Sequence, residues 1–150
     1  MSNSITVKIK KVSDNTITLP AYETAASAGV DLCADLKGPL TISPRENVKI
    51  PTGLAIELPG PHVVAFVFAR SGLASRYGIG LTNGVGVIDS DYRGEIQVLM
   101  QNLGHQPVIV NPGDRIAQMV FMPIFKVVFE EVAELQETAR GTGGFGSTGI

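Results

Sequence analysis

Residues 69–74 near the middle of the chain combine side chains that can bind a phosphorylated ligand. Arg70, Ser71 and Gly72 follow an apolar run at 63–68. A strand that ends here and turns into a helix presents free backbone amides and a guanidinium, and both favour an anion. Serine is also a common helix cap, so a purely structural turn is the alternative. The segment is therefore a candidate phosphate cradle.

A second polar segment, residues 83–95, places an acidic residue directly after an apolar run. The Asn-Gly pair at 83–84 is a strong turn signal, and Asp89 follows the run at 86–88. The backbone of Asp89 is therefore expected to be packed, which would fix its carboxylate as a base. The alternative is that Asp-Ser-Asp at 89–91 is a solvated turn.

The last eleven residues, 140–150, differ from the rest of the chain because five of them are glycine. Residues 141–146 match the dinucleotide-binding pattern G-x-G-x-x-G, but too few residues follow to form the helix that this pattern must open. One interpretation is a disordered tail. The other is an arm that closes over a phosphorylated ligand with Arg140, Phe145 and the Ser-Thr pair at 147–148, because glycine amides can curl around an anion.

These polar segments must be positioned by short strands. The chain has 17 glycines and 9 prolines, which divide it into β-branched and aromatic runs with strand character. An all-β antiparallel sandwich or barrel is predicted, with one short helix over 71–77 that a serine caps and Gly78 ends. Residues 130–139 fit a helical turn or an extended linker. The predicted strands are 6–9, 48–50, 54–58, 63–68, 96–100, 108–110, 116–121 and 126–129.

Composition restricts the class of protein. A length of 150 residues predicts one domain, and 44% hydrophobic with 17% charged residues excludes a disordered chain. The net charge of −2 gives no field to attract nucleic acid or an anionic membrane. Cys33 is the single cysteine, expected to be a small core residue, and His62 and His105 lack partners at zinc spacing. No signal peptide or membrane span is predicted.

Five segments of the chain resemble the five motifs of the homotrimeric deoxyuridine triphosphatases and follow one another in the same order. They cover nearly the whole chain, and five ordered motifs form a specific pattern. The sequence departs from the family pattern at Ala69, where a proline is common. This difference does not change a residue with a chemical role. The matching segments are residues 28–32, 69–74, 86–95, 113–118 and 140–149.

The resemblance implies a jelly-roll-like, distorted β-barrel domain over residues 1–139 and a flexible glycine-rich arm over 140–150. It also implies a homotrimer with active sites at subunit interfaces. The implied reaction is hydrolysis of dUTP to dUMP and pyrophosphate with Mg²⁺, which limits uracil incorporation into DNA and supplies dUMP for thymidylate synthesis. The implied location is the cytoplasm or another intracellular compartment, including the nucleus if the source is eukaryotic or viral.

The resemblance also assigns roles to residues on the phosphate side. Asp89 matches the general base that holds and deprotonates a water aimed at the α-phosphorus. Asp31 and Gln118 match positions that reach Mg²⁺ only through water, and Gln118 is also a substrate-binding position. The residues matching the phosphate cradle are Arg70, Ser71 and Gly72, joined from the arm by Arg140, Ser147 and Thr148.

On the nucleoside side, the matching residues read the base and the sugar. Backbone groups of Gly86, Val87 and Ile88 match those that pair with uracil O4 and N3–H, and the Asn83 amide adds a contact. Tyr92 matches the ring under the deoxyribose, with a barrel core residue as its alternative. Phe145 matches the aromatic that stacks on uracil, and Gly144 and Gly146 flank it.

Several neighbouring charges are expected to be structural. Asp91 and Arg93 are adjacent enough to form a local pair, and so are Asp114 and Arg115. Arg115 is also a candidate to brace a subunit interface.

Two other functions are alternatives to dUTP hydrolysis. A dCTP deaminase on a related fold would need a glutamate near the base to activate water, whereas Asp89 follows Val87-Ile88 here. A catalytically inactive binding module would be indicated by loss of Asp89 or of the arm, and both are present. The hydrolase is therefore preferred.

Overall fold

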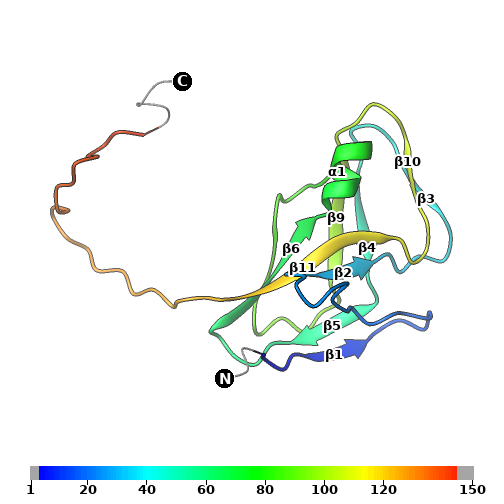
Figure 1. Cartoon of the computed structure of the whole chain (residues 1–150), viewed down its shortest axis with the longest axis horizontal. Helices are drawn as coiled ribbons and strands as arrows, with labels where there is room; N and C mark the ends of the chain where they lie inside the picture. Colours follow the sequence, from blue (N-terminus) through cyan, green and yellow to red (C-terminus); the bar gives the residue numbers. More distant parts are fainter. Residues whose placement is uncertain (1–3, 145–150) are drawn as a thin grey trace.

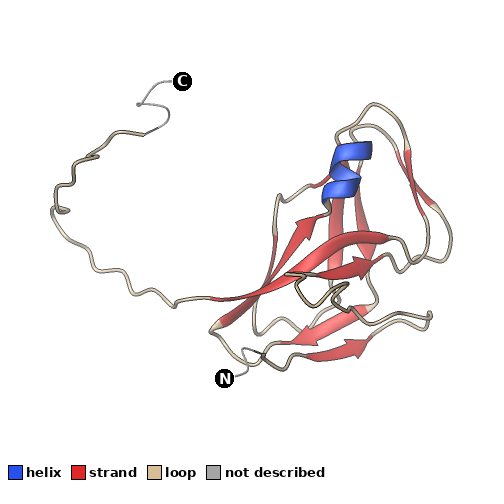
Figure 2. Ribbon diagram, viewed as in Figure 1, coloured by secondary structure: helices blue, strands red, loops and turns tan. Residues whose placement is uncertain are grey.

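The computed structural model describes residues 4–144, in which β-strands dominate and one short helix is present. Figure 1 labels these elements in chain order, and Figure 2 separates strands from loops. The all-β class with one helix is confirmed. The elements are β1 (Lys8–Lys11), β2 (Val30–Cys33), β3 (Leu40–Ile42), β4 (Asn47–Pro51), β5 (Leu54–Glu57), β6 (Val63–Ala69), α1 (Ser71–Tyr77), β7 (Ile79–Leu81), β8 (Gly86–Ile88), β9 (Gln97–Asn102), β10 (Val108–Val110) and β11 (Arg115–Pro123).

The strands form four small antiparallel sheets that together enclose the core. A four-stranded sheet has the order β2-β11-β6-β8, and a three-stranded sheet has the order β4-β9-β7. The pairs β1-β5 and β10-β3 complete the body. Neighbours in these sheets come from distant parts of the sequence, as expected for a jelly-roll-like barrel. Within residues 4–144, no helix is long and apolar enough to cross a membrane.

Alternation along the strands explains which side chains fill the barrel. In β9, Val98, Met100 and Asn102 are buried while Gln97 and Leu99 face outward, as the two-residue period of a strand requires. Asn102 is fully buried, and it satisfies its amide by donating to the carbonyls of residues 42 and 106 and accepting from the amide N–H of residue 104. The outer side of β9 is left free to line a surface pocket.

Helix α1 has the predicted span, but its first turn differs from the prediction. Arg70 occupies the N-cap position and makes no side-chain cap hydrogen bond, and Ser71 is the first helical residue. The helix does end as predicted, because Gly78 has φ of 68° and its N–H bonds to the carbonyls of Ala74 and Leu73. Since Ser71 does not cap the helix, its hydroxyl is not committed to the helix end.

The chain leaves the body after β11 and runs outward in an extended path (Figure 1, yellow to red). The predicted strand at 126–129 is not formed, because no strand of the same chain lies beside it to supply hydrogen bonds. Residues 130–139 are extended, so the helical alternative is wrong. Phe125, Val128 and Phe129 are 95%, 93% and 92% exposed. The boundary at residue 139 between domain and arm stays a prediction.

Candidate active site

The residues predicted to act on a ligand, those of the arm excepted, line two different pockets of the protein. The base pocket, about 290 Å³, contains Asn83, Asp89, Tyr92 and strand β8. The phosphate pocket, about 310 Å³, contains Asp31, Arg70, Ser71, Gly72, Arg115 and Gln118. The two sets of lining residues share no member. The structure therefore assembles the predicted site as two separate halves.

Strand β8 gives the base pocket a wall of backbone groups. It pairs with β6 through Gly86, Val87 and Ile88, and it is the last strand of its sheet. An edge strand presents unpaired N–H and C=O groups on its outer side. Ile88 is buried and anchors the strand, whereas Val87 is 61% exposed. This edge can offer a planar ligand a fixed pattern of donors and acceptors.

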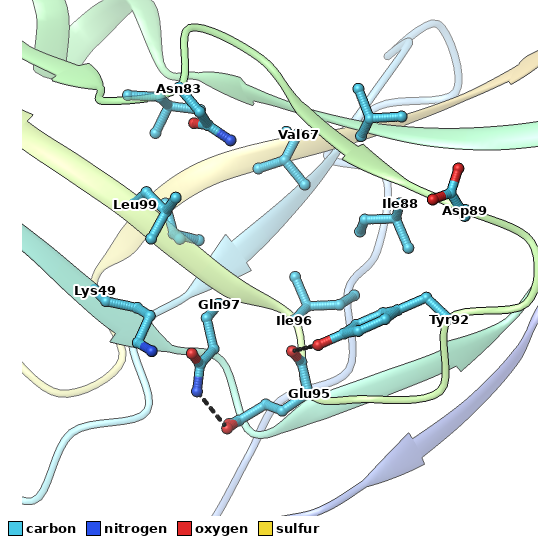
Figure 3. Close-up of a pocket in the computed structure, with 14 residues that line it drawn as sticks. Lys49, Val67, Asn83, Ile88, Asp89, Tyr92, Glu95, Ile96, Gln97 and Leu99 are labelled. Carbon is cyan, nitrogen blue, oxygen red and sulfur yellow. Dashed lines mark hydrogen bonds between the residues drawn. The ribbon is translucent and has the colours of Figure 1, made fainter.

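The Asn-Gly turn brings Asn83 to the same pocket. Gly84 has φ of 70°, and its N–H bonds to the carbonyl of Leu81 at 3.0 Å. This left-handed conformation is the one that glycine adopts without steric cost. The predicted turn is thus confirmed, and it directs the Asn83 amide into the space beside β8 (Figure 3).

Asp89 lies at the end of β8 with its carboxylate exposed at the pocket margin (Figure 3). Its carbonyl accepts the N–H of Tyr92 at 3.1 Å, which closes a turn and holds the backbone in place. No side chain among residues 4–144 forms a hydrogen bond or ion pair with the carboxylate. Both carboxylate oxygens can therefore hold a water molecule.

Tyr92 lines the base pocket and is 46% exposed, so its interpretation as a core residue is wrong. Its Oη donates a hydrogen bond to the carbonyl of Glu95 at 3.0 Å (Figure 3). The Glu95 carboxylate in turn accepts from the N–H of Gly53 at 2.8 Å and from the amide of Gln97 at 3.2 Å. The ring is thereby tied to the barrel.

Three neighbouring strands bring the phosphate-side residues together. Asp31 in β2 pairs in register with Gln118 in β11, and β11 pairs with β6, which ends just before Arg70. A β-bulge interrupts β11 after Arg115, so Ile116 and Ala117 are both buried. The bulge lets Arg115 and Gln118 face one pocket although they are three residues apart.

Charged side chains fix one another in this pocket. Arg70 Nε lies 2.9 Å from Asp31 Oδ1, and Arg115 Nη1 lies 3.2 Å from Asp31 Oδ2. Arg70 also donates to the carbonyl of Arg115 at 3.3 Å, and Arg115 lies 3.6 Å from the exposed carboxylate of Glu23. Two guanidiniums thus share the partly buried Asp31 carboxylate, and their remaining N–H groups can bind an anion.

The two expected local ion pairs are not formed. Arg93 Nη1 donates instead to the carbonyls of Ser90 and Tyr92. Asp114 accepts the N–H of Asn111, and Arg115 pairs with Asp31, 84 positions away. The two arginines therefore serve a turn and the phosphate pocket. Sequence reasoning left Arg115 out of that pocket because no local pattern indicates a bridge between distant strands.

The oxygen atoms of Asp31 and Gln118 are the type that Mg²⁺ prefers, but the structure gives them other partners. Both Asp31 oxygens contact arginines, and Gln118 Nε2 donates to the carbonyl of Ala69 at 3.1 Å, which leaves its amide oxygen for a water. No cluster of three or more metal-ligating side chains occurs within residues 4–144. These residues fit an ion held mainly by a ligand's own phosphates and water.

The described part of the arm reaches neither pocket. Arg140 donates to the carbonyl of Gly143 at 2.9 Å, neither Arg140 nor Gly144 lines either pocket, and the chain after β11 runs away from the body (Figure 1). The other four predicted arm residues lie outside the described part of the chain: Phe145, Gly146, Ser147 and Thr148.

The prediction that Cys33 is a small core residue is wrong, although its surroundings do not suit it to act as a nucleophile. The side chain lies at the end of β2 and is only partly buried. Burial raises the pKa of its thiol, and the neighbouring Asp31 carboxylate raises it further. A thiol with a raised pKa is a poor nucleophile at neutral pH.

Comparison with known proteins places this chain in one family. The dUTPase family model matches residues 15–149. A deoxyuridine 5'-triphosphate nucleotidohydrolase from Desulfitobacterium hafniense is 62% identical over 149 residues, covering 99% of each chain. One from Coxiella burnetii is 50% identical over 150 residues, with 99% of each chain covered.

Solved structures share the fold at low sequence identity. A mutant Staphylococcus bacteriophage 80alpha dUTPase with dUpNHpp has a TM-score of 0.88 at 23% identity, over 98% of this chain and 100% of that one. A mutant dUTPase from phage phi11 of S. aureus, whose structure describes a structural Mg(II) ion, has a TM-score of 0.77 at 22% identity, over 87% and 98%. With the family match over nine-tenths of its length, this chain belongs to the dUTPase family.

Proposed function

We propose that this chain hydrolyses dUTP to dUMP and pyrophosphate in active sites built from two halves on different protomers of a homotrimer. The activity is that of its family, and it limits uracil incorporation into DNA while supplying dUMP for thymidylate synthesis. The observation that carries the proposal is the separation of the base pocket from the phosphate pocket. A nucleoside triphosphate needs both, so a site composed across an interface is the arrangement that unites them.

The extended C-terminal segment supports an assembly of several copies. Its apolar side chains, including Phe125 and Phe129, are exposed in one protomer, and exposed apolar clusters mark contact surfaces. A segment that leaves its own body can carry Arg140 and the residues after it to a neighbour. The proposed arm thus supplies contacts to the pockets of a neighbouring protomer.

Asp89 is the proposed base. Its exposed carboxylate, on a backbone fixed by Ile88 and by the Tyr92 turn, can accept a proton from a water aimed at the α-phosphorus. The water oxygen forms a bond to phosphorus while the bond to the bridging oxygen of pyrophosphate breaks. Positioned proton transfer of this kind contributes roughly 10²–10⁴-fold. Pyrophosphate leaves with its charge neutralised by the phosphate pocket.

The proposed phosphate half uses Arg70, Ser71 and Gly72, with Arg115 beside them. The Asp31 carboxylate holds both guanidiniums before substrate arrives, so little reorganisation is needed when the triphosphate binds. Mg²⁺, when bound to the triphosphate, neutralises charge and orients the phosphates. Asp31 and Gln118 would hold its water ligands.

The proposed nucleoside half selects uracil and deoxyribose. The outer edge of β8 pairs with O4 and N3–H, and cytosine reverses the donor and acceptor there, leaving buried groups unpaired. Asn83 adds an amide contact, and Tyr92 packs under the sugar. From the arm, Phe145 stacks on the base, with Gly144 and Gly146 as its neighbours and Ser147 and Thr148 reaching the phosphates.

A dCTP deaminase is disfavoured by the state of Glu95. This glutamate lines the base pocket, but both of its carboxylate oxygens accept hydrogen bonds, from Gly53 and Gln97. A carboxylate committed to the scaffold is a poor base for activating water at a cytosine ring.

The test is to supply dUTP, dCTP, dTTP and UTP side by side with Mg²⁺ and to follow pyrophosphate and ammonia. Release of pyrophosphate from dUTP, with the other three turned over at least tenfold more slowly, supports the proposal. Ammonia from dCTP, or equal hydrolysis of all four nucleotides, would overturn it.

A further inference from the structure

The Tyr92 ring lies against the backbone of Gly94, two residues along the same loop. A methyl group built on the Cα of Gly94 would overlap Oη of Tyr92 and lie 2.6 Å from Cζ and 3.0 Å from Cε2. These distances are shorter than side-chain carbons normally allow. Any side chain at position 94 would therefore displace the ring from its observed place at the pocket (Figure 3).

Gly94 is required for space and not for backbone conformation. Gly53 and Gly84 have positive φ values of 66° and 70°, which other residues rarely adopt, but Gly94 is not among the glycines with positive φ. An alanine at position 94 could keep the backbone path. Its cost would fall on the tyrosine ring that occupies the space.

The ring's other support is a rigid connection to the core. Oη of Tyr92 donates to the carbonyl of Glu95, and the next residue, Ile96, is 3% exposed. Ile96 N–H donates to the carbonyl of Leu54 at 2.7 Å, and its carbonyl accepts the buried hydroxyl of Thr52 at 2.7 Å. The Glu95 carbonyl that accepts from the ring is therefore held in place by hydrogen bonds of the Glu95 carboxylate and of the Ile96 backbone.

We propose that Gly94 is a positioning residue for sugar selection, because its missing side chain lets the Tyr92 ring lie at one fixed height beneath the sugar. This rests on the proposed role of Tyr92 under the deoxyribose. A 2′-hydroxyl is excluded only if the ring cannot move to make room for it. Gly94 supplies the space, and the Glu95 carbonyl prevents the ring from tilting away.

The experiment measures kcat/KM for dUTP and for UTP and takes their ratio as the sugar selectivity. A ring that rejects one hydroxyl by shape supplies a ratio of roughly 10², so Gly94→Ala is expected to lower it about tenfold. Tyr92→Phe removes only the Oη hydrogen bond and should lower the ratio about fivefold. Gly38→Ala is the matched control, because nothing lies within 4 Å of its added methyl group, and it should leave the ratio unchanged.

The double variant Tyr92→Ala/Gly94→Ala separates a positioning role from general loss of structure. Once the ring is gone, the added methyl group meets nothing that matters for the sugar, so the double variant should have the ratio of Tyr92→Ala alone. Circular dichroism melting of each variant checks that it is folded. If Gly94→Ala does not fold, Tyr92→Phe still tests the support of the ring.

The possible failures are distinguishable. A normal ratio in Tyr92→Ala would overturn the role of Tyr92 and the inference with it. A lowered ratio in Tyr92→Ala but a wild-type ratio in folded Gly94→Ala would overturn the inference alone. An effect of Gly94→Ala that persists at full size without the ring, or a wild-type ratio in Tyr92→Phe, would also overturn it.

Discussion

The base pocket combines the free edge of strand β8 with the Tyr92 and Glu95 side chains, which hydrogen bonds hold to the barrel, whereas the phosphate pocket contains charged side chains that fix one another. Strand β8 offers its free edge and the loop after it is anchored at Glu95. In the other pocket, Asp31 holds Arg70 and Arg115. Backbone edges suit the reading of a donor and acceptor pattern, and guanidiniums suit the neutralisation of phosphate. Changes in the first half should alter selectivity, and changes in the second should affect all nucleoside triphosphates alike.

The largest effect is expected for Asp89→Asn. The amide keeps the shape of the side chain but cannot take a proton from water, so turnover of dUTP should fall by roughly 10²–10⁴-fold. Binding of the nucleotide should change little, because the amide keeps the size and shape of the side chain. Pyrophosphate release gives kcat, and calorimetry gives the Kd for a non-hydrolysable dUTP analogue. Turnover near the wild-type rate would show that Asp89 is not the base.

Deletion of residues 140–150 tests whether the arm contributes to catalysis together with the base pocket and the phosphate pocket. Among the described residues 4–144, Arg140 and Gly141 form hydrogen bonds only within 138–143, so thermal unfolding should be nearly unchanged. Catalysis should fall about tenfold or more, because closure would expel water and strengthen contacts to the phosphates. A wild-type kcat/KM in the shortened protein would contradict a catalytic role for the arm. A clear drop in the melting temperature along with the loss of activity would instead indicate that the arm stabilises the fold.

The single variants Asn83→Ala and Arg70→Ala compare the base pocket, expected to set base preference, with the phosphate pocket, expected to set the rate for every nucleotide. Loss of the Asn83 amide should lower the preference for dUTP over dCTP by about tenfold, because one neutral hydrogen bond to the base is removed. Arg70→Ala should slow every nucleotide that is turned over and leave the preference unchanged. The measurement is kcat/KM for both nucleotides in each variant. A changed base preference in Arg70→Ala would show that the phosphate pocket also contributes to base selectivity, contrary to the account.

The smallest effect concerns Cys33, which lies beside Asp31 but outside the chemistry. Because burial and the nearby carboxylate raise its thiol pKa, the thiolate fraction at pH 7 should be lower than in a free cysteine. Alkylation by iodoacetamide should therefore be slow at pH 7 and should accelerate as the pH rises, with turnover of dUTP unaffected. Mass spectrometry gives the rate, with glutathione as the control. Labelling at pH 7 as fast as that of glutathione would contradict a raised pKa.

Local patterns predicted the elements that depend on local forces. The two-residue alternation of β9, the span of α1 and the turn at Gly84 all follow from side-chain size and backbone preference in short segments. Four of the five ordered motifs contribute residues to the two pockets, and the described part of the fifth reaches neither. These features need no information about distant parts of the chain.

The sequence could not predict what depends on distant partners. The run at 126–129 has strand composition but no strand beside it in the chain, so it stays unpaired. The bulge in β11 depends on how that strand pairs with β2. The Arg115–Asp31 contact joins residues that are 84 positions apart. The sequence therefore indicates only a local partner, Asp114, for Arg115, because the register that carries Arg115 to Asp31 exists only in the folded sheet.

The central claim, that one active site joins halves from two protomers, is tested most directly by mixing Asp89→Asn protein with Arg70→Ala protein. Each parent should hydrolyse dUTP more slowly than the wild type, since every site lacks either the base or the Arg70 guanidinium. After subunit exchange at a 1:1 ratio, about a quarter of the sites should combine two intact halves, so activity should return. If exchange is demonstrated and activity stays at the level of the parents, both halves come from one protomer and the composite site is wrong.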